Sequence, residues 1–199
     1  LDGNEPVAGT GTWTKQSGPG TVAFSDLNAY NATATVSLYG TYVFRWTIQN
    51  ATCNSYDEVT IDFNENPTGR SAGVDQNLCG VKSSTLGGTA HSYEAGSEHT
   101  GSARGWSYIS GPDATPTFSD VNSATSDITV DLYGSYVFRW TETNGTCTQS
   151  DEVTIDFNEN PTGRSAGVDQ SLCGVKTSTL AGTAHSYEAG SEHTGSAGA

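Results

Sequence analysis

Residues 38–63 read LYGTYVFRWTIQNATCNSYDEVTIDF, and their hydrophobic pattern decides the fold. Apolar and polar side chains alternate on both sides of a turn, and this period of two indicates strands with one buried face. A turn centred on Cys53-Asn54 predicts the antiparallel pairs Trp46 with Ile61, Phe44 with Phe63, and Arg45 with Asp62. Apolar residues then share one face of the hairpin and opposite charges share the other.

The same stretch returns 94 residues later in the chain. Residues 132–140 read LYGSYVFRW, residues 57–76 recur unchanged as 151–170, and residues 89–103 recur as 183–197. Such self-similarity indicates tandem domains. We therefore expect a repeat lacking its first strand or strands at 1–67, a complete repeat at 68–161, and the N-terminal part of a following repeat at 162–199.

The second hairpin should have the same register as the first, with Trp140 opposite Ile155 and Arg139 opposite Asp156. Glu142 stands where the first repeat has Ile48, so we expect the core of the second repeat to end earlier.

Shorter strands are expected at 12–16, 22–25 and 33–38, and as two strands joined by a turn within 76–86. Gly-Pro and Tyr-Gly pairs separate these segments, and no stretch has the apolar stripe of a helix. About seven short strands per repeat are typical of an immunoglobulin-like sandwich. The sequence thus predicts an all-β chain of tandem immunoglobulin-like (PKD-like) β-sandwich repeats.

Composition excludes several classes of protein. The chain has 199 residues, with 8 Lys and Arg against 22 Asp and Glu, giving a net charge of −14. Nucleic-acid binders need clustered basic residues, so we expect no nucleic-acid partner. No apolar run reaches the roughly 20 residues of a membrane helix, so we expect no membrane insertion in this segment. The 19 aromatic residues, 4 Trp, 9 Tyr and 6 Phe, can anchor a core.

Each complete repeat holds two cysteines, one entering an early strand and one leaving the penultimate strand. These ends can face each other across a sandwich, so we predict a Cys79–Cys147 disulfide. Cys53 and Cys173 then pair with neighbouring repeats, and a Cys53–Cys79 bond across the repeat boundary is the alternative. Either pairing implies an oxidising compartment outside the cytoplasm.

No catalytic residues are predicted, because the four histidines, His91, His99, His185 and His193, all lie in a duplicated polar loop with no nucleophile motif. The loop HSYEAGSEH (91–99) offers two imidazoles and two carboxylates to a zinc-like ion. Its glycine and the lack of a cysteine ligand favour a solvated, flexible loop instead. Asp151 and Glu152 are adjacent on a strand and point to opposite faces, which excludes a glycosidase pair.

Calcium is a better-founded candidate than a zinc-like ion. The junctions between repeats gather hard oxygen ligands, namely Asp62, Glu65 and Asp75 at the first and Asp156, Glu159 and Asp169 at the second. Pro67 and Pro161 restrict the same junctions, and we expect them to be semi-rigid.

Four motifs together point to a family: AGVDQ-x-LCG, TL-x-G, GTW-x-x-x-SGPG-x-x-x-FSD, and the run from LYGTYVFRWT through the cysteine to DEVTIDF. The chain resembles the PKD-like or immunoglobulin-like repeats of giant Bacteroidota surface proteins, including gliding-motility adhesins of the SprB type. The resemblance implies export by the type IX system, an extracellular position at the cell surface, and a role as stalk or fibre.

Two functions follow as hypotheses. The first is a structural stalk of a surface filament or adhesin, whose partners are neighbouring repeats and an unknown surface or polysaccharide ligand. The second is a carbohydrate-binding or accessory module of a secreted enzyme, with Trp13 or Trp106 as a sugar platform. Trp13, Trp46, Trp106 and Trp140 all recur at repeat positions, which favours the core for all four.

The filament hypothesis allows two assemblies. The repeats belong to one long chain, or residues 162–199 complete the first repeat of another subunit by strand donation, with a Cys173–Cys53 bond. Residues 180–199 would duplicate the strand that begins at Leu1, and this overlap favours the long chain.

Overall fold

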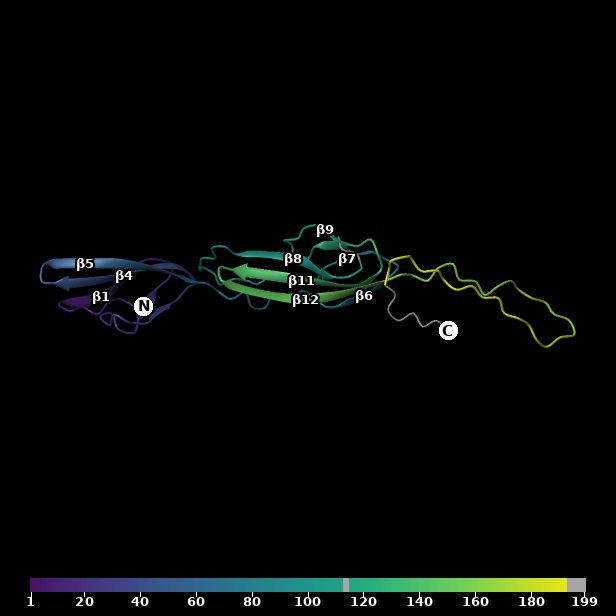
Figure 1. Ribbon diagram of the computed structural model, residues 1–199, viewed down its shortest axis with the longest axis horizontal. Coiled ribbons are helices and arrows are strands. Elements are labelled where there is room, and N and C mark those ends of the chain that lie inside the picture. The colour runs from purple at the N-terminus through teal and green to yellow at the C-terminus, as the bar shows by residue number, and fades with distance from the viewer. Residues whose placement is uncertain (113–114, 193–199) are drawn as a thin grey trace. The chain divides into compact units, whose positions relative to one another are not determined.

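The computed structural model describes residues 1–112 and 115–192, and every regular element in them is a β-strand (Figure 1). The predicted all-β class is confirmed. No helix able to cross a membrane occurs among these residues. The strands are β1 (Thr10–Ser17), β2 (Val22–Phe24), β3 (Ala34–Val36), β4 (Gly40–Asn50), β5 (Cys53–Phe63), β6 (Gln76–Cys79), β7 (Ser83–Thr85), β8 (Ala103–Ser110), β9 (Thr117–Phe118), β10 (Asp127–Thr129), β11 (Gly134–Asn144) and β12 (Cys147–Asn158).

The chain forms two compact units that are interleaved in sequence. The first contains Leu1–Arg70, Ala90–Arg104 and Thr141–Ser150, and the second contains Ser71–Thr89, Gly105–Trp140 and the described part of Asp151–Ala199. β8, β11 and β12 each have residues in both units. The repeat boundaries at 67 and 161 stay predictions.

In the first unit, a sheet in the order β1-β4-β5 packs against the β2-β3 pair. β4 alternates buried and half-buried residues because successive side chains point to opposite faces. Its inner face contributes Tyr42, Phe44 and Trp46 to the core. The Trp46 ring lies 5.0 Å from that of Trp13 on β1, and the Phe44 ring lies 5.8 Å from that of Phe24 on β2.

The hairpin predicted from residues 38–63 forms, but its register differs by four residues along β5. Asn50 lies opposite Cys53, so Ala51 and Thr52 make the turn. Trp46 consequently lies opposite Asp57 and Arg45 opposite Glu58, and the predicted pairs with Ile61, Phe63 and Asp62 were wrong. An even shift leaves each side chain on its predicted face.

In the second unit, β6-β12-β11-β8 form one sheet and β7-β10-β9 the other. The expected division of 76–86 into two strands is confirmed, and the strands belong to different sheets. β6 runs parallel to β12, with Ile155 opposite Gln76 and Asn158 opposite Cys79. Arg139 contacts Glu152 at 2.5 Å, so the predicted Arg139–Asp156 pair was wrong. The difference is four residues, as it is for Arg45 in the first hairpin. The buried residues include all four tryptophans, which confirms their place in the core.

The buried face of β11 does not end at Glu142. Glu142 and Asn144 are both buried, so the alternation continues to the end of the strand with polar side chains. The apolar part of this face ends at Trp140, as expected from Glu142, and the buried positions beyond it are polar. Hydrogen-bond partners from another segment compensate the burial of the Glu142 carboxylate and the Asn144 amide nitrogen.

The four cysteines are free. Cys79 lies opposite Asn158, whereas Cys147 opens β12, and the 11 residues that separate Asn158 from Cys147 span roughly 36 Å of strand. A disulfide needs Cα atoms within about 7 Å. The predicted Cys79–Cys147 bond is therefore incompatible with this strand register, and Cys53–Cys79 is not formed either.

Tyr42 should make the first unit sensitive to alkali. Its hydroxyl donates to Leu38 O at 2.8 Å, and burial, together with the carboxylates of Glu98 and Glu94, raises the pKa of the phenol above 10. The unfolded state then ionises first, so the free energy of unfolding falls as pH rises above about 10.

Tyr42→Phe should lower the free energy of unfolding by about 1 kcal/mol at neutral pH, through the lost hydrogen bond, and flatten its decline above pH 10. Denaturant melts between pH 8 and 11 measure both effects. Tyr56→Phe, at an exposed position, serves as the control. An unchanged alkaline slope in Tyr42→Phe would contradict the assignment.

Candidate functional site

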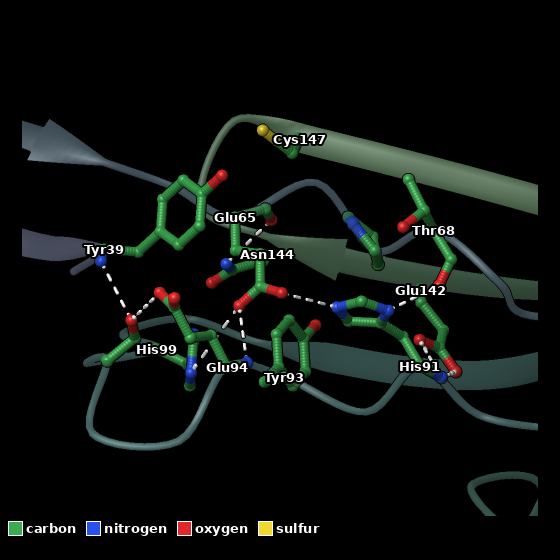
Figure 2. Close-up of polar contacts among 12 residues, drawn as sticks. Tyr39, Glu65, Thr68, His91, Tyr93, Glu94, His99, Glu142, Asn144 and Cys147 are labelled. Atoms are coloured by element: carbon green, nitrogen blue, oxygen red, sulfur yellow. Dashed lines mark hydrogen bonds and ion pairs between the residues drawn. The ribbon is translucent and has the colours of Figure 1, made fainter. Parts of the chain in front are cut away.

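A polar cluster holds the loop that follows β7 on the linker that follows β5, within the first unit (Figure 2). The linker is the segment 64–70 and the loop is 90–99. Glu65 is the centre of the cluster. One of its carboxylate oxygens lies 3.0 Å from His91 Nε2, and the other accepts the Glu94 N–H at 2.9 Å. We call this arrangement the clasp.

His91 has acceptors at both ring nitrogens. Nδ1 contacts Thr68 O, and Nε2 contacts the Glu65 carboxylate. The side chains of His91 and Glu65 are only 8% and 13% exposed, so this contact is shielded from solvent.

Further contacts join the clasp to the end of β11. Glu142 accepts the backbone N–H of His91 at 3.0 and 3.1 Å, and Asn144 Nδ2 donates to Glu65 O at 2.9 Å. These bonds compensate the burial of the Glu142 carboxylate and of the Asn144 amide nitrogen, whereas Asn144 Oδ1 is buried without a hydrogen-bond partner among the described residues. Tyr93 lies between the two imidazoles, with ring centroids 4.6 Å from His91 and 4.3 Å from His99.

The surroundings of Tyr93 are acidic. Burial raises the pKa of its phenol, and the carboxylates of Glu142 and Glu65 raise it further, against an opposing effect of Arg104. The phenol therefore stays neutral in the physiological range and packs as an aromatic spacer.

The tip of the loop is fixed on Tyr39, just before β4. Tyr39 N–H donates to Ser97 Oγ at 2.9 Å, Glu98 N–H donates to Tyr39 O at 3.0 Å, and Ser97 Oγ donates to Glu94 at 2.8 Å. Gly96 has a φ of +87°, a conformation that residues with a side chain rarely adopt. The linker supplies partners for the backbone and the histidine of the loop, while residues 92, 94–96 and 98 are exposed to solvent. The flexibility of the loop stays a prediction.

The clasp occurs a second time, 94 residues later, within the second unit. His185 Nε2 contacts Glu159 at 2.9 Å, Glu188 N–H donates to Glu159 at 2.7 Å, and Tyr133 N–H donates to Ser191 Oγ at 2.9 Å. His193 lies outside the described residues. The identity of linker and loop in both repeats was a signal for this pairing that sequence reasoning did not use.

The structure does not bring the proposed metal ligands together. No group of three His, Cys, Asp or Glu side chains able to hold a metal ion occurs in residues 1–112 and 115–192. Glu65 and Glu159 bind imidazoles and backbone N–H groups, Asp62 accepts the Thr41 hydroxyl, and Asp75 accepts the Thr154 N–H. Calcium binding stays a prediction, as does any role for Asp156 and Asp169.

Comparisons with known proteins place the fold. No protein-family model matches the chain, and no curated protein matches it. Extracellular domains 3–5 of Drosophila OTK align with a TM-score of 0.50 and 12% identity, over 74% of this chain and 51% of that one. Titin domains I67–I69 align with a TM-score of 0.40 and 13% identity, over 76% of this chain and 55% of that one. The PKD domain of KIAA 1837 aligns with a TM-score of 0.37 and 26% identity, over 49% of this chain and 92% of that one.

The chain thus spans about half the length of the OTK and titin structures. The two packed sheets of each unit and the likeness to the OTK domains assign the chain to the immunoglobulin-like β-sandwich fold.

Proposed function

We propose that the chain is a stalk segment of an extracellular filament or adhesin at the cell surface, serving attachment or gliding motility. The recurrence of the clasp carries this proposal. In both occurrences a loop encoded by one repeat folds onto the linker that leaves the preceding repeat. An arrangement of this kind can be extended by any number of repeats, which suits a tandem array.

Catalysis is not part of the proposed function. The histidines of the clasp, His91 and His185, bind backbone carbonyls and carboxylates rather than a nucleophile. The alternative of a carbohydrate-binding module loses its main argument, because Trp13 and Trp106 are buried and offer no platform to a sugar.

Acidity fits the same proposal. A net charge of −14 keeps fibres dispersed by mutual repulsion. Type IX export, the SprB-type role and a polysaccharide or other surface ligand follow from the sequence resemblance and are part of the proposal. Packing and the clasps contribute stability within each unit.

Antibodies raised against the chain test this function in the organism that makes it. We expect labelling of intact cells, and a band on a denaturing gel far above the 20.7 kDa of the chain that persists in reductant. Collapse to about this mass only in reductant would mean disulfide-linked subunits. Labelling only after lysis would overturn the surface location.

A further inference from the structure

The two long hairpins, β4–β5 and β11–β12, differ from each other at one end. Between residues 38 and 63 the first repeat differs from the second at Thr41, and otherwise only within residues 48–56, where the hairpin turns. We call residues 142–147, and their counterparts 48–53, the turn ends of the two hairpins. Substitutions gathered at one end of otherwise matching strands indicate that the two turn ends are built for different neighbours.

Glu142 makes the turn end of the second repeat part of the clasp. Its side chain is buried, and its carboxylate accepts the His91 N–H at 3.0 and 3.1 Å (Figure 2). The first repeat has Ile48 at this position, and an isoleucine side chain offers no acceptor. A buried N–H that loses its acceptor costs free energy. An isoleucine at position 142 would therefore weaken the hold on the loop 90–99.

Gly145 leaves room for the linker 64–70. A Cβ added at this position would lie 2.3 Å from Asn64 Oδ1 and 2.5 Å from Asn64 Cγ. The first repeat has Ala51 here, with a φ of 52° against 56° for Gly145, so the backbone of the turn is the same. An alanine at position 145 would therefore fit the turn but displace the side chain of Asn64.

The loop that precedes the first long strand of each repeat also differs. The segment 1–12 is eight residues shorter than its counterpart 86–105 and has neither histidine. It folds back on its own hairpin, because Trp46 Nε1 donates to Asn4 O at 3.2 Å. Ile48 packs against the core of the same unit. The first repeat thus has no group that could play the part of His91 in a clasp.

Loop and turn end therefore change together from one repeat to the other. In the second repeat both contact the linker that leaves the repeat before it, since His91 contacts Glu65 and Asn144 donates to Glu65 O. Neither part closes the clasp alone. Without Glu142 the His91 N–H lacks its acceptor, and without His91 the Glu65 side chain lacks its partner.

We propose that the turn end is the surface by which a repeat recognises the linker of the repeat before it, and that Glu142 and Gly145 select a linker of sequence NENPTGR closed by a histidine loop. A turn end with isoleucine and alanine, as in the first repeat, rejects this partner. The two repeats are then not interchangeable in order. This inference rests on the proposed stalk function and deepens it, because the ends of the repeats determine which repeat can follow which.

Hydrogen exchange of the full chain tests the proposal, with residues of the first turn end placed in the second. Glu142→Ile/Gly145→Ala should accelerate exchange in the linker 64–70 and the loop 90–99 by about tenfold or more, because the loop loses an acceptor and the linker loses its space. Thr148→Asn transfers an exposed residue of the same hairpin and is the matched control, with wild-type exchange expected. Unchanged exchange in β7 and β10 would show that the second unit stays folded.

A second set of variants isolates the steric role of Gly145. Gly145→Ala alone should release the linker, and Gly145→Ala/Asn64→Ala should restore wild-type exchange, because the side chain that the added Cβ would meet is gone. Ala51→Gly, at the equivalent turn of the first repeat, should leave the clasp unchanged.

Wild-type protection of the linker and loop in Glu142→Ile/Gly145→Ala, or in Gly145→Ala, would overturn the proposal. Failure of Asn64→Ala to rescue Gly145→Ala would overturn it as well. None of these results would alter the labelling of intact cells or the mass of the native protein, so the stalk function is tested separately.

Discussion

Replacing Phe157 by alanine should lower the free energy of unfolding of the second unit by about 3–5 kcal/mol, and Phe63→Ala should cost the first unit only about 2 kcal/mol. Both phenylalanines end the sequence DEVTIDF. Phe157 is fully buried, while Phe63 is half-buried beside the outer edge of β5, which pairs with no strand among residues 1–112 and 115–192. The cavity left by truncation is larger where the ring is enclosed.

Hydrogen exchange followed by mass spectrometry separates the two effects, because protected amides report the stability of each region. Phe157→Ala should accelerate exchange in β11 and β12, and Phe63→Ala in β4 and β5. The two substitutions are each other's control, since their local sequences are identical. Equal losses of the free energy of unfolding in both units would show that the open edge of β5 does not change the contribution of Phe63 to stability.

Glu65→Ala should lower the free energy of unfolding of the first unit by about 3 kcal/mol, because it leaves a shielded ring nitrogen of His91 and the backbone N–H of Glu94 without their partner. Glu58→Ala should cost no more than about 1 kcal/mol. The Arg45–Glu58 contact is shorter, 2.6 Å against 3.0 Å for His91–Glu65. Its side chains are 32% and 40% exposed, however, so water replaces the lost interaction.

Limited proteolysis provides the second readout for Glu65→Ala. The loop 90–99 should be cleaved faster in this variant and at the wild-type rate in Glu58→Ala. His91→Ala should resemble Glu65→Ala if the pair holds the loop. A loop that stays protected in both variants would mean that Tyr39 and Glu142 suffice to hold it.

Local pattern was sufficient to predict the strands and their buried faces, but not their register. The alternation of apolar and polar residues in 38–63 identifies the inner face of the hairpin wherever the turn lies. The turn itself was misplaced, although Gly145, the first of the two turn residues in the second hairpin, is a turn signal. Gly145 and its counterpart Ala51 both have positive φ, 56° and 52°. Glycine at position 145 signals a turn in the sequence, whereas alanine at the equivalent position 51 does not.

The clasp and the positions of the cysteines depend on contacts between segments that are distant in the sequence. The alternation of apolar and polar residues within one strand carries no information about such contacts. Glu65 and His91 are 26 residues apart and lie in segments without regular pattern. Cys79 and Cys147 were assigned to facing strand ends, whereas β6 pairs with the far end of β12. A parallel pairing of this kind can be recognised only once the neighbours of β12 are known.

The parallel pairing of β6 with β12 also determines how the second unit would respond to mechanical load. The chain enters this sheet at the start of β6 and leaves it at the end of β12, and the two strands run in the same direction. Tension on the chain would therefore slide them past each other and load all four residue pairs of the contact at once. Opening would need these bonds to rupture together rather than one after another, so this short contact would act as a shear lock in a stretched fibre.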